Sequence, residues 1–128
     1  MLLMDLDNFK LINDSFGHRT GDKVLVEVAG RLKRFLRDAD MGARLGGDEF
    51  TVVLEDVVYA SESLKAAERF HAQLRAPIAV DGQKVNTSVS IGIAVGAEEQ
   101  PEELVHAADL AMYQAKSGGK ARSVLFDL

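Results

Sequence analysis

The chain of 128 residues carries a formal net charge of −5 and contains no cysteine. Its length suits one domain with a single core over residues 1–128, and its acidic balance excludes a broad basic surface for nucleic acid. The lack of cysteine excludes disulfides and thiolate metal sites and, without a signal peptide or an apolar stretch of membrane-spanning length, predicts a cytoplasmic protein.

The first third of the chain predicts a strand and two helices. Residues 1–6 (MLLMDL) form an apolar run that is typical of a buried strand. Residues 8–22 predict a short helix followed by a loop, with four apolar side chains turned inward: Phe9, Leu11, Ile12 and Phe16. From Asp22 to about Arg37, apolar residues recur at helical spacing with charges opposite, which predicts an amphipathic helix.

The stretch RLGGDEF joins two apolar runs that are typical of short strands, residues 41–45 and 50–54. Gly46 and Gly47 predict a hairpin bend between them, because glycine adopts positive φ at little cost. Asp48 and Glu49 follow this bend directly. Two adjacent like charges repel each other unless a cation lies between them and a partner, so the turn suggests a metal site.

The rest of the chain predicts a second amphipathic helix, a small hairpin around an Asp-Gly turn, a central strand, a third helix and a closing strand: 61–75, 78–85, 86–96, 101–117 and 123–126. The order β-α-β-β-α-β, with additions, predicts an α+β fold of ferredoxin-like or palm type. In this split βαβ plan, a central antiparallel sheet has helices packed around it, on one face.

The first strand lies centrally in this plan, so Asp5 at its end is expected to meet Asp48 at one edge of the sheet. Two or three carboxylates without cysteine and with few histidines form a hard oxygen site suited to Mg²⁺ or Mn²⁺. Mg²⁺ usually completes its shell with water and substrate phosphates, so such a site suits nucleoside triphosphates. A carboxylate that ends a buried apolar strand is costly without a partner or a metal, which favours this role for Asp5.

Several linked blocks resemble the GGDEF family of diguanylate cyclases, in the right order and at matching spacing: MDLDNFKLINDSFGHRTGD, RLGGDEF, SVSIGIAVG and AADLAMYQAKSGGKA. The resemblance covers almost the whole chain. It implies an enzyme that condenses two GTP molecules into cyclic di-GMP and two pyrophosphates, on a sheet similar to the palm of polymerases. It also implies a homodimer, because each domain brings one GTP to the shared bond.

The resemblance implies a role for each matching residue. Asp5, Asp48 and the backbone carbonyl of Leu6 would hold two Mg²⁺ or Mn²⁺ ions per active site. Asp48 is also the candidate base that takes the hydroxyl proton, Glu49 supports it, and Lys10 stabilises the developing charge. The remaining matches would contact the nucleotide: the backbone amides of Phe9 and Lys10 and the side chains of Lys116 and Lys120 at the phosphates, Asn13 and Asp22 at the guanine edge, and His18 nearby.

The stretch RDAD, residues 37–40, matches the RxxD element of the family, which implies an inhibitory site that binds the product cyclic di-GMP. Arg37 would contact a phosphate or a guanine, Asp40 would accept from the base, and Arg69 would make a secondary contact. Plainer explanations remain open: Asp22 is an acceptable helix N-cap, Lys116 complements a helix dipole, and Arg37 with Asp40 is alternatively a surface pair worth about 0–1 kcal/mol.

The sequence departs from the family pattern at two places. The family carries a helix before the first strand, introduced by a motif similar to DxLTGLxNR that this chain lacks, so we expect a fragment of a longer multidomain signalling protein. The tail SVLFDL resembles the lead-out toward an EAL phosphodiesterase domain. Lys120 and Ala121 replace the usual Arg-Asn, which loses a bidentate phosphate contact.

A second function therefore stays open beside the cyclase. The alternative is a catalytically inactive GGDEF module that binds GTP or cyclic di-GMP and regulates a neighbouring sensory or EAL domain.

Overall fold

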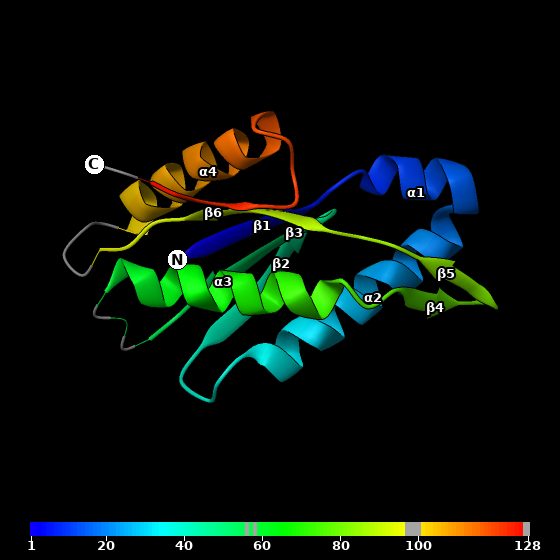
Figure 1. The fold of residues 1–128 in the computed structure, drawn as a ribbon, viewed down its shortest axis with the longest axis horizontal. Coiled ribbons are helices and arrows are strands. Elements are labelled where there is room, and N and C mark those ends of the chain that lie inside the picture. The colour runs from blue at the N-terminus through cyan, green and yellow to red at the C-terminus, as the bar shows by residue number, and fades with distance from the viewer. Residues whose placement is uncertain (56, 58, 97–100, 127–128) are drawn as a thin grey trace.

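The apolar strand β1 (Leu2–Leu6) is the centre of the fold, as the sequence predicts. It lies in a five-stranded sheet of order β2-β3-β1-β6-β7, whose other strands are β2 (Met41–Gly46), β3 (Glu49–Val53), β6 (Val89–Ile93) and β7 (Ser123–Leu125). The structure, a computed structural model, describes residues 1–55, 57, 59–96 and 101–126. Figure 1 shows the sheet between layers of helices.

The sheet is mixed, because β7 pairs in parallel with β6 while every other pair is antiparallel. The register places Asp5 opposite Glu49 on one side and opposite Ser90 on the other. The predicted small hairpin is confirmed as a separate pair, β4 (Ile78–Val80) and β5 (Gln83–Val85). The α+β class and the palm-type plan are therefore confirmed, with one parallel pair added.

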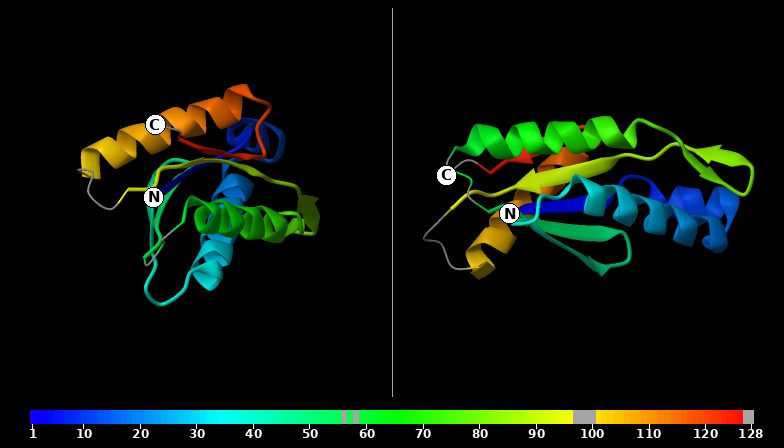
Figure 2. Two further views of the ribbon diagram at one scale, coloured as in Figure 1. Left: turned by 60° about the vertical axis from the view of Figure 1, so that its left-hand side comes forward. Right: turned by 90° about the horizontal axis from the view of Figure 1, so that it is seen from below.

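Helices cover both faces of the sheet, so the prediction that they share one face is wrong. Two helices, α2 (His18–Phe35) and α3 (Ala60–Leu74), pack on the face that carries Leu2 and Met4. The helix α4 (Pro101–Ser117) packs on the opposite face against Leu3 (Figure 2). The physical reason is that β1 is apolar at successive positions, so both of its faces need a cover.

The packing of α4 on the sheet depends on Gly92 in β6. A Cβ atom there would collide with the backbone of Ala108 and Met112. Glycine therefore lets the helix axis approach the strand closely. As a result α4 crosses the sheet over β6 and β1 and brings its last turn to the end of β1.

The second helix begins earlier than predicted. The helix α1 (Phe9–Phe16) is confirmed, but only Gly17, with φ of 92°, separates it from α2. The expected loop before Asp22 is therefore helical, and the N-cap alternative for Asp22 is wrong. Of the four side chains expected to turn inward, Leu11 and Phe16 are 62% and 40% exposed, because one short helix buries a single stripe.

Near the C-terminus, β7 confirms most of the predicted closing strand, while residues 127–128 of the tail lie outside the described residues. Among the helices of the described ranges, none combines the length and apolar character that a membrane crossing requires.

Candidate functional site

The end of β1 and the β2–β3 turn come together, as expected from the split βαβ plan. The N–H of Leu6 donates to the carbonyl of Asp48 at 3.1 Å. This contact joins the strand that carries Asp5 to the turn that carries Asp48, so two carboxylates far apart in sequence lie side by side. Glu49 begins β3 directly opposite Asp5.

Asp5 is in an unusual electrostatic environment. Its side chain is only 14% exposed, and Oδ2 forms an ion pair with Nζ of Lys116 at 2.8 Å. Its other oxygen, Oδ1, is buried and has no hydrogen-bond partner. Burial raises the pKa of Asp5 to about 6, and the neighbouring Asp48 carboxyl adds to this rise against the opposite effect of Lys116.

These residues fit a divalent cation. A buried carboxylate oxygen without a donor is costly, and a cation would satisfy it. The nearby atoms that can coordinate a metal are carboxylate and carbonyl oxygens, which Mg²⁺ and Mn²⁺ prefer as ligands. No cluster of three or more His, Cys, Asp or Glu side chains suited to a metal is found in the described part of the chain. The protein would therefore contribute two carboxylates and a backbone carbonyl, and water and phosphate oxygens would complete the shell.

The two glycines of the turn are required by backbone conformation rather than by space. Gly46 and Gly47 have φ of 140° and 54°, and a Cβ on either would meet nothing within 4 Å. A β-bulge between Arg44 and Gly46 precedes them. Arg44 braces the turn, because its Nε and Nη2 donate to the carbonyl of Gly47 at 3.0 and 2.7 Å. The turn thereby holds Asp48 at the end of β1.

Where α1 meets α2, a polar group is buried without a partner. The Oδ1 of Asn13 has no hydrogen-bond partner. A Cβ on Gly21 would collide with this oxygen, so glycine in α2 makes room for the amide. Asp22 and His18 are exposed on the same helix. An acceptor in this position suits an N–H group of a bound molecule, such as those on the edge of guanine.

The start of α1 lies directly after β1, which carries Asp5. The amides of Phe9 and Lys10 are in the first turn and have no partner within the helix, and the side chain of Lys10 is exposed. Lys120, from the loop after α4, reaches this point and donates from Nζ to Oδ1 of Asn8 at 2.7 Å. Amides and lysine ammonium groups therefore gather beside the two carboxylates, as phosphate recognition requires.

One residue of this region was missed from the sequence. Asp7 is 3% exposed and accepts hydrogen bonds from the hydroxyls of Ser88 and Ser90 and from the N–H of Ala121. A carboxylate two residues after Asp5, just beyond an apolar strand, was the available signal. Its partners could not be inferred, because they lie 81 to 114 residues away in the sequence.

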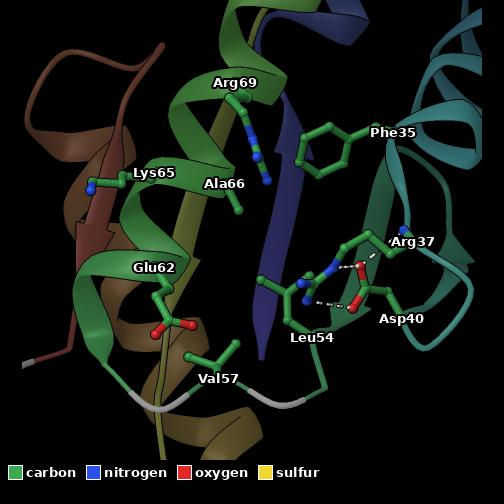
Figure 3. Close-up of a pocket in the computed structure, with 9 residues that line it drawn as sticks. All are labelled: Phe35, Arg37, Asp40, Leu54, Val57, Glu62, Lys65, Ala66 and Arg69. Atoms are coloured by element: carbon green, nitrogen blue, oxygen red, sulfur yellow. Dashed lines mark hydrogen bonds and ion pairs between the residues drawn. The ribbon is translucent and has the colours of Figure 1, made fainter.

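The predicted inhibitory residues line a separate hollow of about 230 Å³ between α3 and the start of β2 (Figure 3). Oδ2 of Asp40 accepts from the backbone N–H and from Nε of Arg37, at 3.0 and 3.1 Å, and Oδ1 accepts from Nη2 at 3.2 Å and from the N–H of Glu55 at 3.3 Å. Arg69 reaches from α3 over the ring of Phe35, 5.6 Å from its centroid.

The ion pair between Arg37 and Asp40 is thus present, and both side chains also line the hollow. Burial acts to raise the pKa of Asp40, yet the hydrogen bonds from Arg37 and from the backbone outweigh it and hold this pKa below its usual value. Lys65 and Glu62, which line the same hollow, were not singled out from the sequence. The hollow thus carries three basic side chains and two carboxyl groups, which suit an anionic ligand with polar edges.

Comparisons with known proteins agree with one another. Residues 1–122 match the family model described as "Diguanylate cyclase, GGDEF domain". The chain is 44% identical over its whole length to the diguanylate cyclase TpbB of Pseudomonas aeruginosa and spans 30% of that protein. It is 39% identical over 98% of its length to the cyclic di-GMP phosphodiesterase NbdA of the same species, of which it spans 16%. The chain thus covers less than a third of these relatives.

Solved structures show the same fold. The GGDEF domain of TpbB superposes with a TM-score of 0.95 at 45% identity, covering 99% of this chain and 81% of that one. The GGDEF domain of DgcB from Caulobacter crescentus, solved in complex with cyclic di-GMP, superposes with a TM-score of 0.90 at 29% identity, covering 97% and 75%.

Proposed function

The chain belongs to the GGDEF family of diguanylate cyclases, and on that premise we propose that it condenses two GTP molecules into cyclic di-GMP and two pyrophosphates. The observation that carries the proposal is the pairing of Asp5 with Asp48, where a buried carboxylate oxygen has no donor of its own. The buried acceptor of Asn13 adds support for guanine as the base.

The proposed roles follow from where each group lies. Asn13 and Asp22 would accept from the N–H groups of guanine, with His18 beside the nucleotide. The amides of Phe9 and Lys10, together with Lys116 and Lys120, would hold the triphosphate. The side chains therefore orient the α-phosphate toward the carboxylate pair.

In the proposed reaction, the 3′-oxygen of one GTP attacks the α-phosphorus of the other. The new P–O bond forms as the bond to the β-phosphate oxygen breaks, and pyrophosphate leaves. Asp48 would take the hydroxyl proton, with Glu49 supporting it, and Lys10 would stabilise negative charge on the phosphoryl oxygens. Two Mg²⁺ or Mn²⁺ ions held by Asp5, Asp48 and the carbonyl of Leu6 would supply Lewis-acid charge neutralisation.

Two domains must face each other for this reaction, because the attacking hydroxyl and the α-phosphate belong to different nucleotides. A homodimer supplies the second GTP. We place the reaction in the cytoplasm, where GTP is available, and we expect a sensory or EAL domain elsewhere in the full-length protein to control the pairing.

The first test is direct. The chain is incubated with GTP and Mg²⁺, and the nucleotides are separated by chromatography and identified by mass. We expect cyclic di-GMP from the unaltered chain and none from Asp48→Ala. The matched control is Glu103→Ala, which removes a carboxylate about 20 Å away along α4 from Lys116 and should leave turnover unchanged. Retained activity in a folded Asp48→Ala variant contradicts the proposed role.

We also propose product inhibition at the hollow of Arg37, Asp40 and Arg69. The basic lining and the cyclic di-GMP held by the related DgcB domain support it. Arg37→Ala should raise the cyclic di-GMP concentration that halves activity, with little change in the initial rate. Unchanged inhibition would leave Arg37 and Asp40 as a structural pair alone.

A second candidate function is a regulatory module that binds GTP or cyclic di-GMP without turnover. The similarity to NbdA, which is named a phosphodiesterase, and Lys120 in place of arginine favour it. A fused coiled coil that forces dimerisation separates the two functions. Turnover that appears on fusion supports the cyclase, whereas tight nucleotide binding without turnover supports the module.

A further inference from the structure

Asp7 is a buried charge to which the proposed chemistry gives no role. Of the Asp, Glu, Lys and Arg residues in the described ranges, Asp7 alone is buried as a whole residue; the Asp40 side chain is also 3% exposed, but the guanidinium of Arg37 is its partner. No ion pair to Asp7 is found among these residues either. A buried carboxylate without a cation is costly unless hydrogen bonds satisfy it. The structure around Asp7 must therefore supply those bonds.

The donors to Asp7 come from two distant segments. The hydroxyls of Ser88 and Ser90, at the start of β6, donate to its two oxygens at 2.6 Å each. The backbone N–H of Ala121, in the loop between α4 and β7, donates to Oδ2 at 2.9 Å. The N–H of Asp7 itself donates to the carbonyl of Ser88 at 2.9 Å. One side chain thus joins the end of β1, the start of β6 and the loop after α4.

This loop has a conformation that needs support. Gly119, Lys120 and Ala121 all have positive φ, at 121°, 65° and 49°. A left-handed conformation costs a non-glycine residue about 1 kcal/mol or more, so the surroundings must hold it. Asp7 stabilises this conformation by accepting a hydrogen bond from the N–H of Ala121. Asn8, the next residue, contributes a second hydrogen bond, in which its Oδ1 accepts from Nζ of Lys120 at 2.7 Å.

We propose that Asp7 is a positioning residue, which fixes the loop 118–122 on the start of α1 so that Lys120 and the amides of Phe9 and Lys10 meet the same triphosphate. This inference rests on the proposed function, in which those groups bind the phosphates of GTP. Asp7 itself is 3% exposed, and its oxygens accept from Ser88, Ser90 and Ala121, so it would act on the nucleotide through the loop. Its effect is therefore on the geometry of the phosphate site.

The role depends on the shape of the side chain more than on its charge. An asparagine can keep one oxygen for Ser88 and Ala121, while its amide N–H donates to the hydroxyl of Ser90, which can also accept. A glutamate keeps the carboxyl group but is one methylene longer, so its oxygens cannot keep the contacts of 2.6–2.9 Å with Ser88, Ser90 and Ala121 unless one of these segments moves. The two substitutions therefore separate geometry from charge.

The test compares a triphosphate with a monophosphate of the same nucleoside. Calorimetry measures the binding of guanosine 5′-[α,β-methylene]triphosphate, which cannot release pyrophosphate, and of GMP, both with Mg²⁺. For Asp7→Ala we expect the affinity for the triphosphate to fall about tenfold, with less than a twofold change for GMP. Asp7→Asn should resemble the unaltered chain, and Asp7→Glu should lose at least about threefold in triphosphate affinity.

A double-mutant cycle checks that Asp7 acts through the loop. In the background of Lys120→Ala, Asp7→Glu should reduce triphosphate affinity by a smaller factor than in the unaltered chain, because one of the positioned groups is already absent. A purely structural role would lower the midpoint of thermal unfolding without changing the ratio of triphosphate to GMP affinity. If Asp7→Ala does not fold, Asp7→Asn and Asp7→Glu decide the question.

Two results overturn the inference by itself: an unchanged affinity ratio in Asp7→Glu, or an impaired Asp7→Asn beside an unimpaired Asp7→Glu. Both leave the proposed function standing, provided that the unaltered chain binds the triphosphate. If the unaltered chain does not bind it, the proposed function fails and this inference fails with it.

Discussion

The Arg37–Asp40 pair predicts unequal losses of stability when its two members are removed. The Asp40 side chain is 3% exposed, whereas that of Arg37 is 62% exposed. Asp40 accepts two hydrogen bonds from the guanidinium and two from backbone N–H groups, those of Arg37 and Glu55. The carboxylate is therefore the buried centre of the arrangement, which ties the entry of β2 to the segment after β3.

The magnitudes follow from which groups lose their partners. Asp40→Ala leaves two backbone N–H groups without an ionised acceptor, and we expect a loss of about 2–3 kcal/mol in the free energy of unfolding. Arg37→Ala leaves the backbone bonds to Asp40 in place and removes a guanidinium that is itself exposed, so we expect a loss of about 1 kcal/mol or less. Asp38→Ala, in the same loop and exposed, is the matched control and should change stability by about 0.5 kcal/mol at most.

Urea denaturation followed by circular dichroism at pH 7 measures these differences, and the same titrations at lower pH test their origin. Since the folded pKa of Asp40 is lowered, its contribution is present above the unfolded value of about 4 and is lost as the pH falls through the folded value. Equal losses for Asp40→Ala and Arg37→Ala, or a loss from Asp40→Ala that persists undiminished in acid, would refute the reasoning.

Three further predictions concern the nucleotide site. Gly21→Ala should weaken GTP binding about tenfold in calorimetry by displacing the Asn13 amide, whereas Gly30→Ala in the same helix, whose Cβ meets only the flexible end of an arginine at 3.3 Å, should leave binding unchanged and raise stability by about 0.5–1 kcal/mol. Ala121→Asn should raise the free energy of unfolding in urea by about 0.5 kcal/mol, because asparagine tolerates positive φ better than alanine; a lower value contradicts this. The pKa of Asp5 is raised to about 6 in the folded protein. Its protonated form therefore stabilises the fold at low pH, and this contribution to the free energy of unfolding is lost as the pH rises through 6. Mg²⁺ needs the ionised form, so its affinity should fall about tenfold between pH 7.5 and pH 5, and a pH-independent affinity would contradict a role for Asp5 as a ligand.

Local sequence patterns were sufficient to predict most of the helices and strands. The apolar run of β1, the two glycines before Asp48 and the helical spacing after Pro101 each specify an element through the conformations and faces of neighbouring residues. The central place of β1 also followed, because a split βαβ order leaves few topologies for the chain. From that order of elements, the proximity of Asp5 and Asp48 could be predicted.

Errors arose where a local pattern was compatible with two arrangements. Helical spacing in residues 101–117 shows that one stripe of α4 is buried, but not on which face of the sheet it packs. Polar stretches with glycine occur both in loops and at short helix breaks, so the sequence does not distinguish the single break at Gly17 from the longer loop that it predicts. The packing of α4 against β6 decides which face of the sheet it covers. The structure shows that α2 is continuous from His18, so no longer loop follows Gly17.

By itself, the sequence determined which residues match the GGDEF family pattern, and hence which residues are proposed for the carboxylate pair, for guanine and for the RxxD pair. Only the tertiary structure decided that Asp5 has an unsatisfied buried oxygen beside Lys116, that Gly21 makes room for Asn13, and that Asp7 joins three segments. The physical reason is distance along the chain. Motifs record chemistry over a few residues, whereas burial and hydrogen bonding depend on partners such as Ser88 and Ala121, which only folding brings to Asp7.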